Sequence, residues 1–214
     1  MTGISDILTA SYSSSRDADT IGKELKKLIG AESNYEIIRL ALGCSLGLDS
    51  FPEPAPDAKG GVIKGLQLFG DEASCNYLWI GMLAEMLRRR GEDALTLEAL
   101  QKLVRDHWHR GILLLERYRD CLDQAASLYQ SELHTLNDGS TLMLFHSEDS
   151  GEDYLTNAIC CGELLRALGH ALQIEVADSG ITLQLQLGLT VSDDLFGMTQ
   201  IDLLLTESAQ DALA

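Results

Sequence analysis

The stretch from Asp19 to Gly70 constrains the fold of this chain most, because it carries the clearest helix boundaries. Apolar residues recur at spacings of three and four, which is the period of one helix face. These residues are Ile21, Leu25, Leu28 and Ile29. Gly30 follows them where a helix commonly ends in a glycine cap. We therefore expect a first short helix over 19–29.

A second short helix follows at once. Ser33 and Glu36 have the spacing of a capping box, in which each side chain binds a free backbone N–H at the start of the helix. Apolar residues continue towards Leu46, and Gly47 then marks the helix end. All three prolines of the chain fall within 52–56, so we expect an extended, exposed connector there.

The segments on either side of these helices are short and irregular. Residues 57–70 are framed by glycines and predict a loop or a short ribbon, but they lack the GxxxxGK[ST] pattern of a nucleotide-binding loop. Upstream, 7–12 predicts either a short strand or a partly ordered arm. An extended segment before two short helices is the order of a helix-turn-helix or ribbon-helix-helix unit. In a ribbon-helix-helix repressor, this strand would pair with the same strand of the dimer mate, and its side chains would read the DNA bases.

Two longer helices are expected next. Residues 72–90 are so apolar that most of this helix must be buried, either in the domain or at an oligomer interface. Arg88, Arg89 and Arg90 close it, either complementing the helix dipole or projecting onto DNA. A second helix over 96–131 begins at Thr96, and Gly111 is expected to bend or interrupt it. Its arginines alternate with acidic residues, which favours pairing within the helix.

Three segments in this order resemble the DndE family of the DNA sulfur-modification (phosphorothioation) systems, which act in anti-phage defence. The resemblance covers roughly residues 15–120 and excludes 137–214. The three segments are "IGKELKKLIGAESNYEIIRLALGCSL", "KGGVIKGLQLFG" and "LWIGMLAEMLRRRG".

The resemblance implies a mainly helical N-terminal domain that self-associates, as tetramers in this family, and contacts intact or nicked duplex DNA. It also implies two protein partners, a sulfur-transfer enzyme and an SMC-like ATPase. Contacts to DNA would be mostly to phosphate and sensitive to salt. The alternative interpretation of the same cations is a solvated helix face. The candidate DNA contacts are Lys23, Lys26, Lys27, Arg39, Lys64, Arg88, Arg89 and Arg90.

Charge divides the chain into unequal parts. Residues 1–136 hold 15 of the 16 basic and 20 of the 33 acidic residues, a net charge of −5. Residues 137–214 hold one basic and 13 acidic residues, a net of −12. We therefore predict a helical domain over 1–136 and an acidic domain over 137–214. The acidic domain should repel DNA, whereas the helical domain can bind DNA if its cations share one face.

The acidic domain is expected to be a small α+β unit with an antiparallel sheet, which makes the fold class α+β overall. A helix is predicted over 154–168, ended by Gly169. Strands are predicted over 141–145, 172–176, 182–187 and 201–205, the third from strict alternation of Leu and Gln.

Several classes of protein find no support in the sequence. The five cysteines are scattered and lack the paired spacing of a metal or disulfide framework. His107 and His109 would point to different sides of one helix, which argues against a metal site. We expect no catalytic site and no cofactor, since no catalytic constellation or nucleotide motif is present. Without a signal segment or a membrane-spanning run, a cytoplasmic location is expected.

Two functions remain. The first is a non-catalytic DNA-binding accessory subunit of a sulfur-modification system. The alternative is an oligomeric protein–protein adaptor whose acidic domain recruits a partner enzyme without touching DNA. A contiguous patch of the N-terminal cations would favour the first function, whereas cations scattered among intrahelical ion pairs would favour the second.

Overall fold

The structure is a computed structural model that describes residues 3–29, 31–48, 50–91, 95–135, 141–147, 151–176, 187–189 and 191. It is mostly helical, with two small antiparallel two-stranded sheets, and is α+β overall. Two compact units divide it at 118/119, within a long helix, and each is described by itself. The predicted division at 136/137 stays a prediction. None of the described helices combines the length and apolar character that crossing a bilayer requires.

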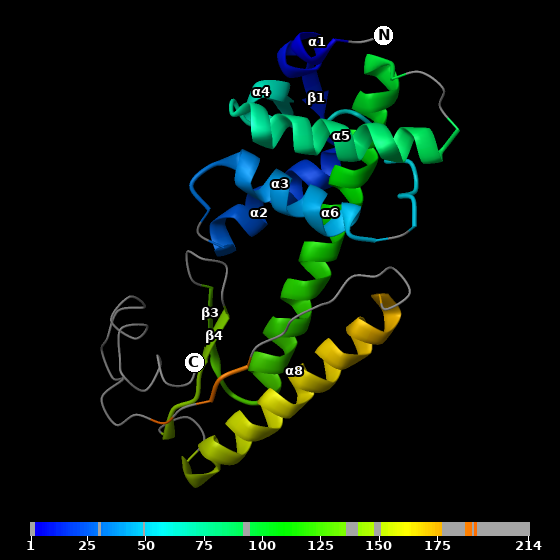
Figure 1. Cartoon of the computed structure of the whole chain (residues 1–214). Helices are drawn as coiled ribbons and strands as arrows, with labels where there is room; N and C mark the ends of the chain where they lie inside the picture. The colour runs from blue at the N-terminus through cyan, green and yellow to red at the C-terminus, as the bar shows by residue number, and fades with distance from the viewer. Residues whose placement is uncertain are drawn as a thin grey trace. The chain divides into compact units, whose positions relative to one another are not determined.

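Figure 1 shows the order of the elements. Unit 1 begins with α1 (Ile4–Thr9), β1 (Ser11–Ser13), α2 (Arg16–Ile29), α3 (Asn34–Leu46), β2 (Val62–Lys64), α4 (Gly65–Phe69) and α5 (Ala73–Arg89). Helix α6 (Leu97–Leu128) continues into unit 2, which adds β3 (Glu132–Thr135), β4 (Thr141–Leu144), the 3-10 turn η1 (Gly151–Asp153) and α8 (Tyr154–Val176).

The two predicted short helices are confirmed as α2 and α3. Gly47 caps the end of α3 as expected, and its N–H donates to the carbonyl of Gly43. The start of α3 differs from the predicted capping box. Ser33 makes no side-chain cap, because its hydroxyl donates to Glu36 Oε1 at 2.6 Å.

The strand expected over 7–12 is wrong over its first half, which is helical in α1. Only β1 is extended, and it pairs antiparallel with β2 of the same chain, with Tyr12 opposite Ile63. Side chains from α6 hold the carbonyls of β1: Gln101 Nε2 donates to Ser11 O at 2.8 Å and Arg105 Nε to Ser13 O at 3.3 Å. These carbonyls are therefore already occupied by the chain's own α6.

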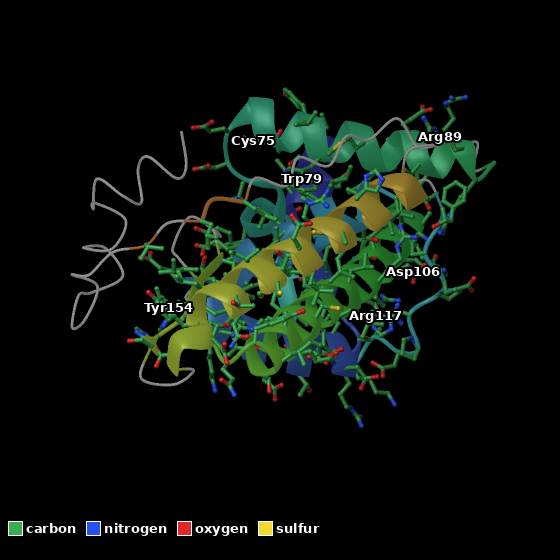
Figure 2. All side chains as sticks on the ribbon, turned by 90° about the horizontal axis from the view of Figure 1, so that it is seen from below. Cys75, Trp79, Arg89, Asp106, Arg117 and Tyr154 are labelled. Carbon is green, nitrogen blue, oxygen red and sulfur yellow. The ribbon has the colours of Figure 1, made fainter. Side chains whose placement is uncertain are left out.

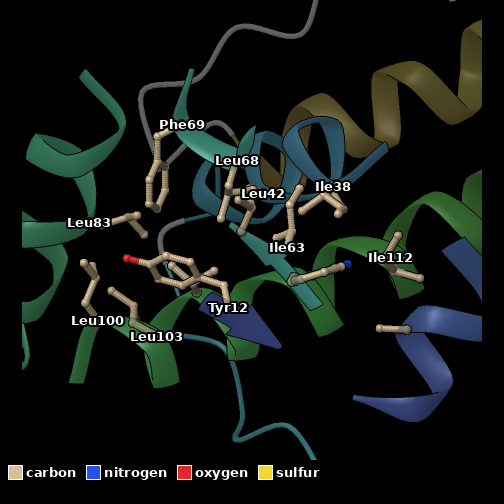
Figure 3. Close-up of a cluster of buried hydrophobic side chains, with 14 of the residues drawn as sticks. Tyr12, Ile38, Leu42, Ile63, Leu68, Phe69, Leu83, Leu100, Leu103 and Ile112 are labelled. Atoms are coloured by element: carbon tan, nitrogen blue, oxygen red, sulfur yellow. The ribbon is translucent and has the colours of Figure 1, made fainter. Parts of the chain in front are cut away.

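The core of unit 1 forms around this small sheet (Figure 3). Tyr12 is fully buried, its ring meets Phe69 edge-on with centroids 5.3 Å apart, and its hydroxyl donates to Ile7 O at 3.1 Å. Helix α2 packs on α3, and α4 contacts α1, α3 and α5. Trp108 from α6 is also part of this core.

Helix α6 runs without a break through Gly111, so the predicted interruption there is wrong. A side chain at this glycine would overlap the backbone of Ala41, so the glycine allows α3 and α6 to cross closely. The predicted pairing within α6 holds for Arg119 with Asp123. It is wrong for Arg105 and for Arg110, whose guanidinium binds Ser45 and Ser50 instead.

The described part of unit 2 is more helical than predicted. The strand over 141–145 is confirmed as β4, and it pairs with β3, which the sequence analysis missed. Helix α8 passes Gly169 and ends at Val176, so the predicted strand over 172–176 is wrong. Buried Cys161 of α8 donates to the sulfur of Met143 at 3.5 Å. The strands expected over 182–187 and 201–205 lie outside the described residues, except for Leu187.

Candidate functional site

The eight predicted DNA contacts do not form one patch. Lys23, Lys26 and Lys27 lie on α2 and Arg39 on α3, whereas Arg88 and Arg89 end α5. Figure 1 shows α2 and α5 on opposite sides of α3. Lys64 is on β2, and Arg90 caps the end of α5.

Arg39 and Arg90 hold the protein's own carbonyl groups. Arg39 donates from Nε to Leu68 O at 2.8 Å and from Nη2 to Gln67 O at 2.9 Å, and its guanidinium lies 4.7 Å from the centre of the Tyr35 ring. Arg90 donates to Pro52 O at 3.2 Å and stacks over Phe51. These two arginines fasten one segment of unit 1 to another.

The remaining contacts are weaker. Arg88 donates two hydrogen bonds of 2.8 Å to Glu85, and Arg89 a longer one of 3.3 Å. These hydrogen bonds lower the pKa of Glu85 to about 2. Lys23 pairs with Asp19 at 2.7 Å, and Lys64 donates to Ser11 Oγ at 2.9 Å. Exposed polar contacts of this kind contribute little to the free energy of folding, so they break readily.

Two lysines of α2 meet at a surface hollow of about 390 Å³. Lys23 and Lys26 stand on one wall, and Asn34 and Gln67 supply polar groups from α3 and α4. Asp19, which pairs with Lys23, also lines it, as do buried Ile37 and Trp108 of α6. Lys27 lies on the same helix and makes no side-chain hydrogen bond or ion pair with the described residues. We call this hollow the α2–α3 hollow.

A second hollow, of about 440 Å³, lies where α4 leads into α5 and is called the α4–α5 hollow. It is lined by Tyr35, Arg39, Leu66, Gln67, Gly70, Asp71, Glu72 and Cys75. Asp71 and Glu72 are exposed there, and Arg39 faces it while bound to its two carbonyls. Its rim therefore offers two carboxylates that no described side chain pairs.

Helix α5, which was expected to be buried in the domain or at an oligomer interface, is covered by unit 1 on one side only. Tyr77 is 56% exposed, Leu78 63% and Met82 37%, although the same helix buries Ile80 and Leu83. The spacing of these residues was visible in the sequence. It could not show which face of an almost wholly apolar helix the fold covers.

The two histidines of α6 serve separate contacts within unit 1. His107 Nδ1 lies 2.9 Å from Ser45 Oγ, and His109 Nδ1 lies 2.8 Å from Ser15 Oγ. Among the described residues no group of three or more His, Cys, Asp or Glu side chains is arranged to hold a metal ion. Both histidines therefore contribute to packing between α6 and earlier segments.

No protein-family model matches the sequence, and no curated protein matches it significantly. The class of protein is thus defined by the fold alone: a mostly helical α+β protein with dispersed cations and an exposed apolar helix face.

Proposed function

We propose that this protein is a non-catalytic adaptor subunit of a DNA sulfur-modification system, which joins protein partners without gripping DNA itself. The observation that supports this proposal is that most of the candidate cations already bind groups of the protein itself. Six of the eight candidate DNA contacts already bind groups of the protein; these are Lys23, Arg39, Lys64, Arg88, Arg89 and Arg90.

The cost of releasing a cation differs between these residues. Arg39 and Arg90 would leave carbonyl groups without partners, and hydrogen bonds from a charged group contribute about 1.5–3 kcal/mol each. Lys23, Arg88 and Arg89 are in exposed pairs and can be released at little cost. The residues that can turn to phosphate therefore lie on separate elements: Lys23, Lys26 and Lys27 on α2, Lys64 on β2, and Arg88 and Arg89 at the end of α5.

The overall charge supports the same proposal. The chain has a net charge of −17, which repels a polyanion at long range. An acidic surface and an exposed apolar helix face suit protein partners better than DNA. The order β1, α2, α3 follows that of a ribbon-helix-helix unit. We therefore also propose that unit 1 is a variant ribbon-helix-helix unit, in which β1 pairs with β2 of the same chain instead of with a dimer mate.

The test is binding by the full chain in two assays. The first assay measures binding of the full chain to intact and to nicked duplex DNA by fluorescence anisotropy, at salt concentrations between about 50 and 200 mM. The second measures binding of the sulfur-transfer enzyme and the SMC-like ATPase by pull-down with purified proteins. We expect retention of a protein partner and no DNA binding. Salt-dependent DNA binding without any protein partner would overturn the adaptor proposal.

A second candidate function is DNA binding through α2. Lys23 and Lys26 share the α2–α3 hollow, and Lys27 is available beside them. If α2 binds phosphate, K26E/K27E should lower the affinity and reduce the slope of log K against log salt by about 1.8, since each phosphate contact contributes about 0.9. The matched control is K59E, which reverses an exposed charge in the loop before β2. Equal effects of both variants would exclude an α2 site.

A further inference from the structure

The two hollows of unit 1 adjoin each other. Tyr35 of α3 and Gln67 of α4 line both of them, so these two residues lie between the hollows. With volumes of about 390 and 440 Å³, the hollows together form a longer groove that leads from α2 to the start of α5. We call it the α2–α5 groove.

The centre of the α2–α5 groove is apolar and open. Val62 of β2 lines the first hollow and is 68% exposed, and Leu66 of α4 lines the second and is 50% exposed. The ring of Tyr35, between the hollows, is 38% exposed. Large apolar side chains gathered along an exposed groove are typical of a surface that binds another molecule.

Arg39 holds the centre of the groove in place. Its guanidinium donates to Gln67 O at 2.9 Å and lies 4.7 Å from the centre of the Tyr35 ring. The two residues shared by the hollows are therefore tied to one side chain. A surface that is ordered before binding loses less conformational entropy when a partner binds to it.

The α2 end of the groove has a positive net charge. Lys23, Lys26 and Asp19 line this hollow, which gives a net charge of +1, and Asp19 pairs with Lys23 at 2.7 Å. Lys26 makes no side-chain hydrogen bond or ion pair with the described residues. Glu36, whose carboxylate is near enough to sense Lys26, is bound by the hydroxyl of Ser33. Lys26 is thus the cation available at this end.

The α5 end of the groove has a negative net charge. Asp71 and Glu72 share this hollow with the single guanidinium of Arg39, which gives a net charge of −1. Both carboxylates are exposed, and neither makes a side-chain hydrogen bond or ion pair with the described residues. Cys75 lines the same hollow, and Figure 2 shows it at the opposite end of α5 from Arg89. The basic end of α5 is therefore remote from these carboxylates.

We propose that the α2–α5 groove binds an extended segment of a protein partner, in which an acidic and a basic residue flank apolar residues. The acidic residue pairs with Lys26, the apolar residues cover Val62 and Leu66, and the basic residue pairs with Asp71 and Glu72. The inference rests on the adaptor function proposed above and deepens it, because it names the binding surface and the chemistry of the segment that the surface receives.

The charges of the groove disfavour two other occupants. A nucleic acid strand is negative along its whole length, so Asp71 and Glu72 repel it. Residues 137–214 of this chain hold 13 acidic residues and one basic residue, Arg166, which lies within helix α8 and is not extended. A segment with one charge of each sign at its ends fits both ends of the groove.

The first test uses the full chain and synthetic peptides as probes. The matched peptide has acidic residues at one end, leucine and alanine in the centre and lysines at the other end, and its centre is lengthened residue by residue. Two control peptides carry acidic residues or lysines at both ends. Alkylation of Cys75 is followed by mass spectrometry at peptide concentrations up to about 1 mM. We expect only the matched peptide to protect Cys75, whereas exposed Cys44 and Cys121 should react as before.

Charge variants show which end of the groove binds which charge. E72K should weaken binding of the matched peptide by about fivefold or more and allow the peptide with two acidic ends to bind. K26E should weaken it similarly and allow the peptide with two lysine ends to bind. The matched controls, E53K and K59E, reverse exposed charges in the connector and should leave binding unchanged.

A leucine pair tests the apolar centre. L66E places a carboxylate in the groove and should weaken binding by about tenfold. L28E is the matched control, because Leu28 on α2 is also 50% exposed and lines neither hollow, and it should bind as the unchanged chain does. Far-ultraviolet circular dichroism checks that each variant remains folded. The purified sulfur-transfer enzyme and SMC-like ATPase are then tested for protection of Cys75 in the same way.

The inference is overturned if no matched peptide protects Cys75, or if L66E and L28E behave alike. It is also overturned if protection of Cys75 rises with the concentration of this chain alone, which would assign the groove to a second copy. These outcomes are separable from those of the adaptor function. Retention of a purified partner without protection of Cys75 would overturn the groove and leave the adaptor function standing. Specific peptide binding by a chain that retains neither partner would do the reverse.

Discussion

Ser45 Oγ lies 2.9 Å from Nδ1 of His107, and both side chains are fully buried between α3 and α6. Arg110 Nε donates to the same hydroxyl at 2.7 Å. The other ring nitrogen of His107, Nε2, has no hydrogen-bond partner among the described residues. The imidazole is therefore held in its neutral form next to a permanent positive charge.

The first prediction is a loss of stability in mild acid. Burial first, and then the charges of Arg110 and Arg90, lower the pKa of His107 from 6.5 to about 4, although Asp106 opposes them. Between these two pKa values the unfolded chain binds a proton that the folded chain does not. Stability is therefore complete above pH 6.5 and falls as the pH drops towards 4, by about 2 kcal/mol between about pH 7 and pH 5.

Urea unfolding monitored by tryptophan fluorescence measures this effect, because both tryptophans, Trp79 and Trp108, lie in unit 1. H107Q removes the titrating group, so its unfolding free energy should depend less on pH than that of the unchanged chain. H170Q, at an exposed position on α8, is the control and should keep the original pH dependence. Identical pH profiles for H107Q and the unchanged chain would contradict the prediction.

A second prediction concerns the crossing of α3 and α6. G111A would drive its methyl group into the backbone of Ala41, which cannot move as a flexible side chain can. We expect a loss of about 3 kcal/mol or more in the free energy of unfolding. The control G43A adds the same methyl group to an open position of α3 and should stabilise the helix by up to about 1 kcal/mol. The same urea experiment compares the two, and an unaffected G111A would show that the helices do not cross this closely.

A third prediction separates a structural role of Arg39 from a role in binding. R39Q removes the charge that donates to the carbonyls of Leu68 and Gln67 and should cost about 2–3 kcal/mol of stability. K27Q removes an exposed charge and should change stability by less than about 0.5 kcal/mol. Thermal unfolding of both variants checks this. If R39Q unfolds like the unchanged chain, Arg39 becomes available again as a ligand-binding residue.

A fourth prediction concerns the proline connector. Asp106 is 2% exposed, accepts the N–H of Ala55 at 2.9 Å and pairs with Lys102 at 2.8 Å. D106A removes both contacts, so the connector should be cut faster by proteases. D106N keeps an oxygen for Ala55 and should protect the connector better than D106A does. Limited proteolysis followed by mass spectrometry locates the cuts, and equal cleavage rates would mean that Asp106 does not anchor the connector.

The local sequence signals were sufficient to predict α2, α3, α5 and α6. Each of these helices has an apolar period, and the ends of α3 and α6 carry recognisable caps: Gly47 ends α3, and Thr96 accepts the N–H of Ala99 at the start of α6. Where the prediction failed, tertiary structure decided. Leu172 to Val176 alternate as in a strand, yet they continue α8. Gly111 suggested a break in α6 because its close neighbour, Ala41, is 70 residues away in the chain.

The candidate site was harder to predict than the fold. The sequence identified the basic residues but not their acceptors, because Arg39 and Arg90 bind carbonyl groups 28 and 38 residues away. Any carbonyl in the chain can accept such a bond, so composition gives no sign of it. The same limit applies to α5, whose apolar residues were expected to be buried in the domain or at an oligomer interface; the sequence could not show that unit 1 leaves Leu78 and Met82 exposed.

The contacts between β1 and α6 have a consequence for synthesis of the chain. The carbonyl groups of Ser11 and Ser13 accept hydrogen bonds from Gln101 and Arg105, which lie 90 and 92 residues later in the chain. The N-terminal segment leaves the ribosome long before these partners exist. Unit 1 can therefore complete its fold only after α6 has emerged, and until then the start of the chain waits with its polar backbone in water.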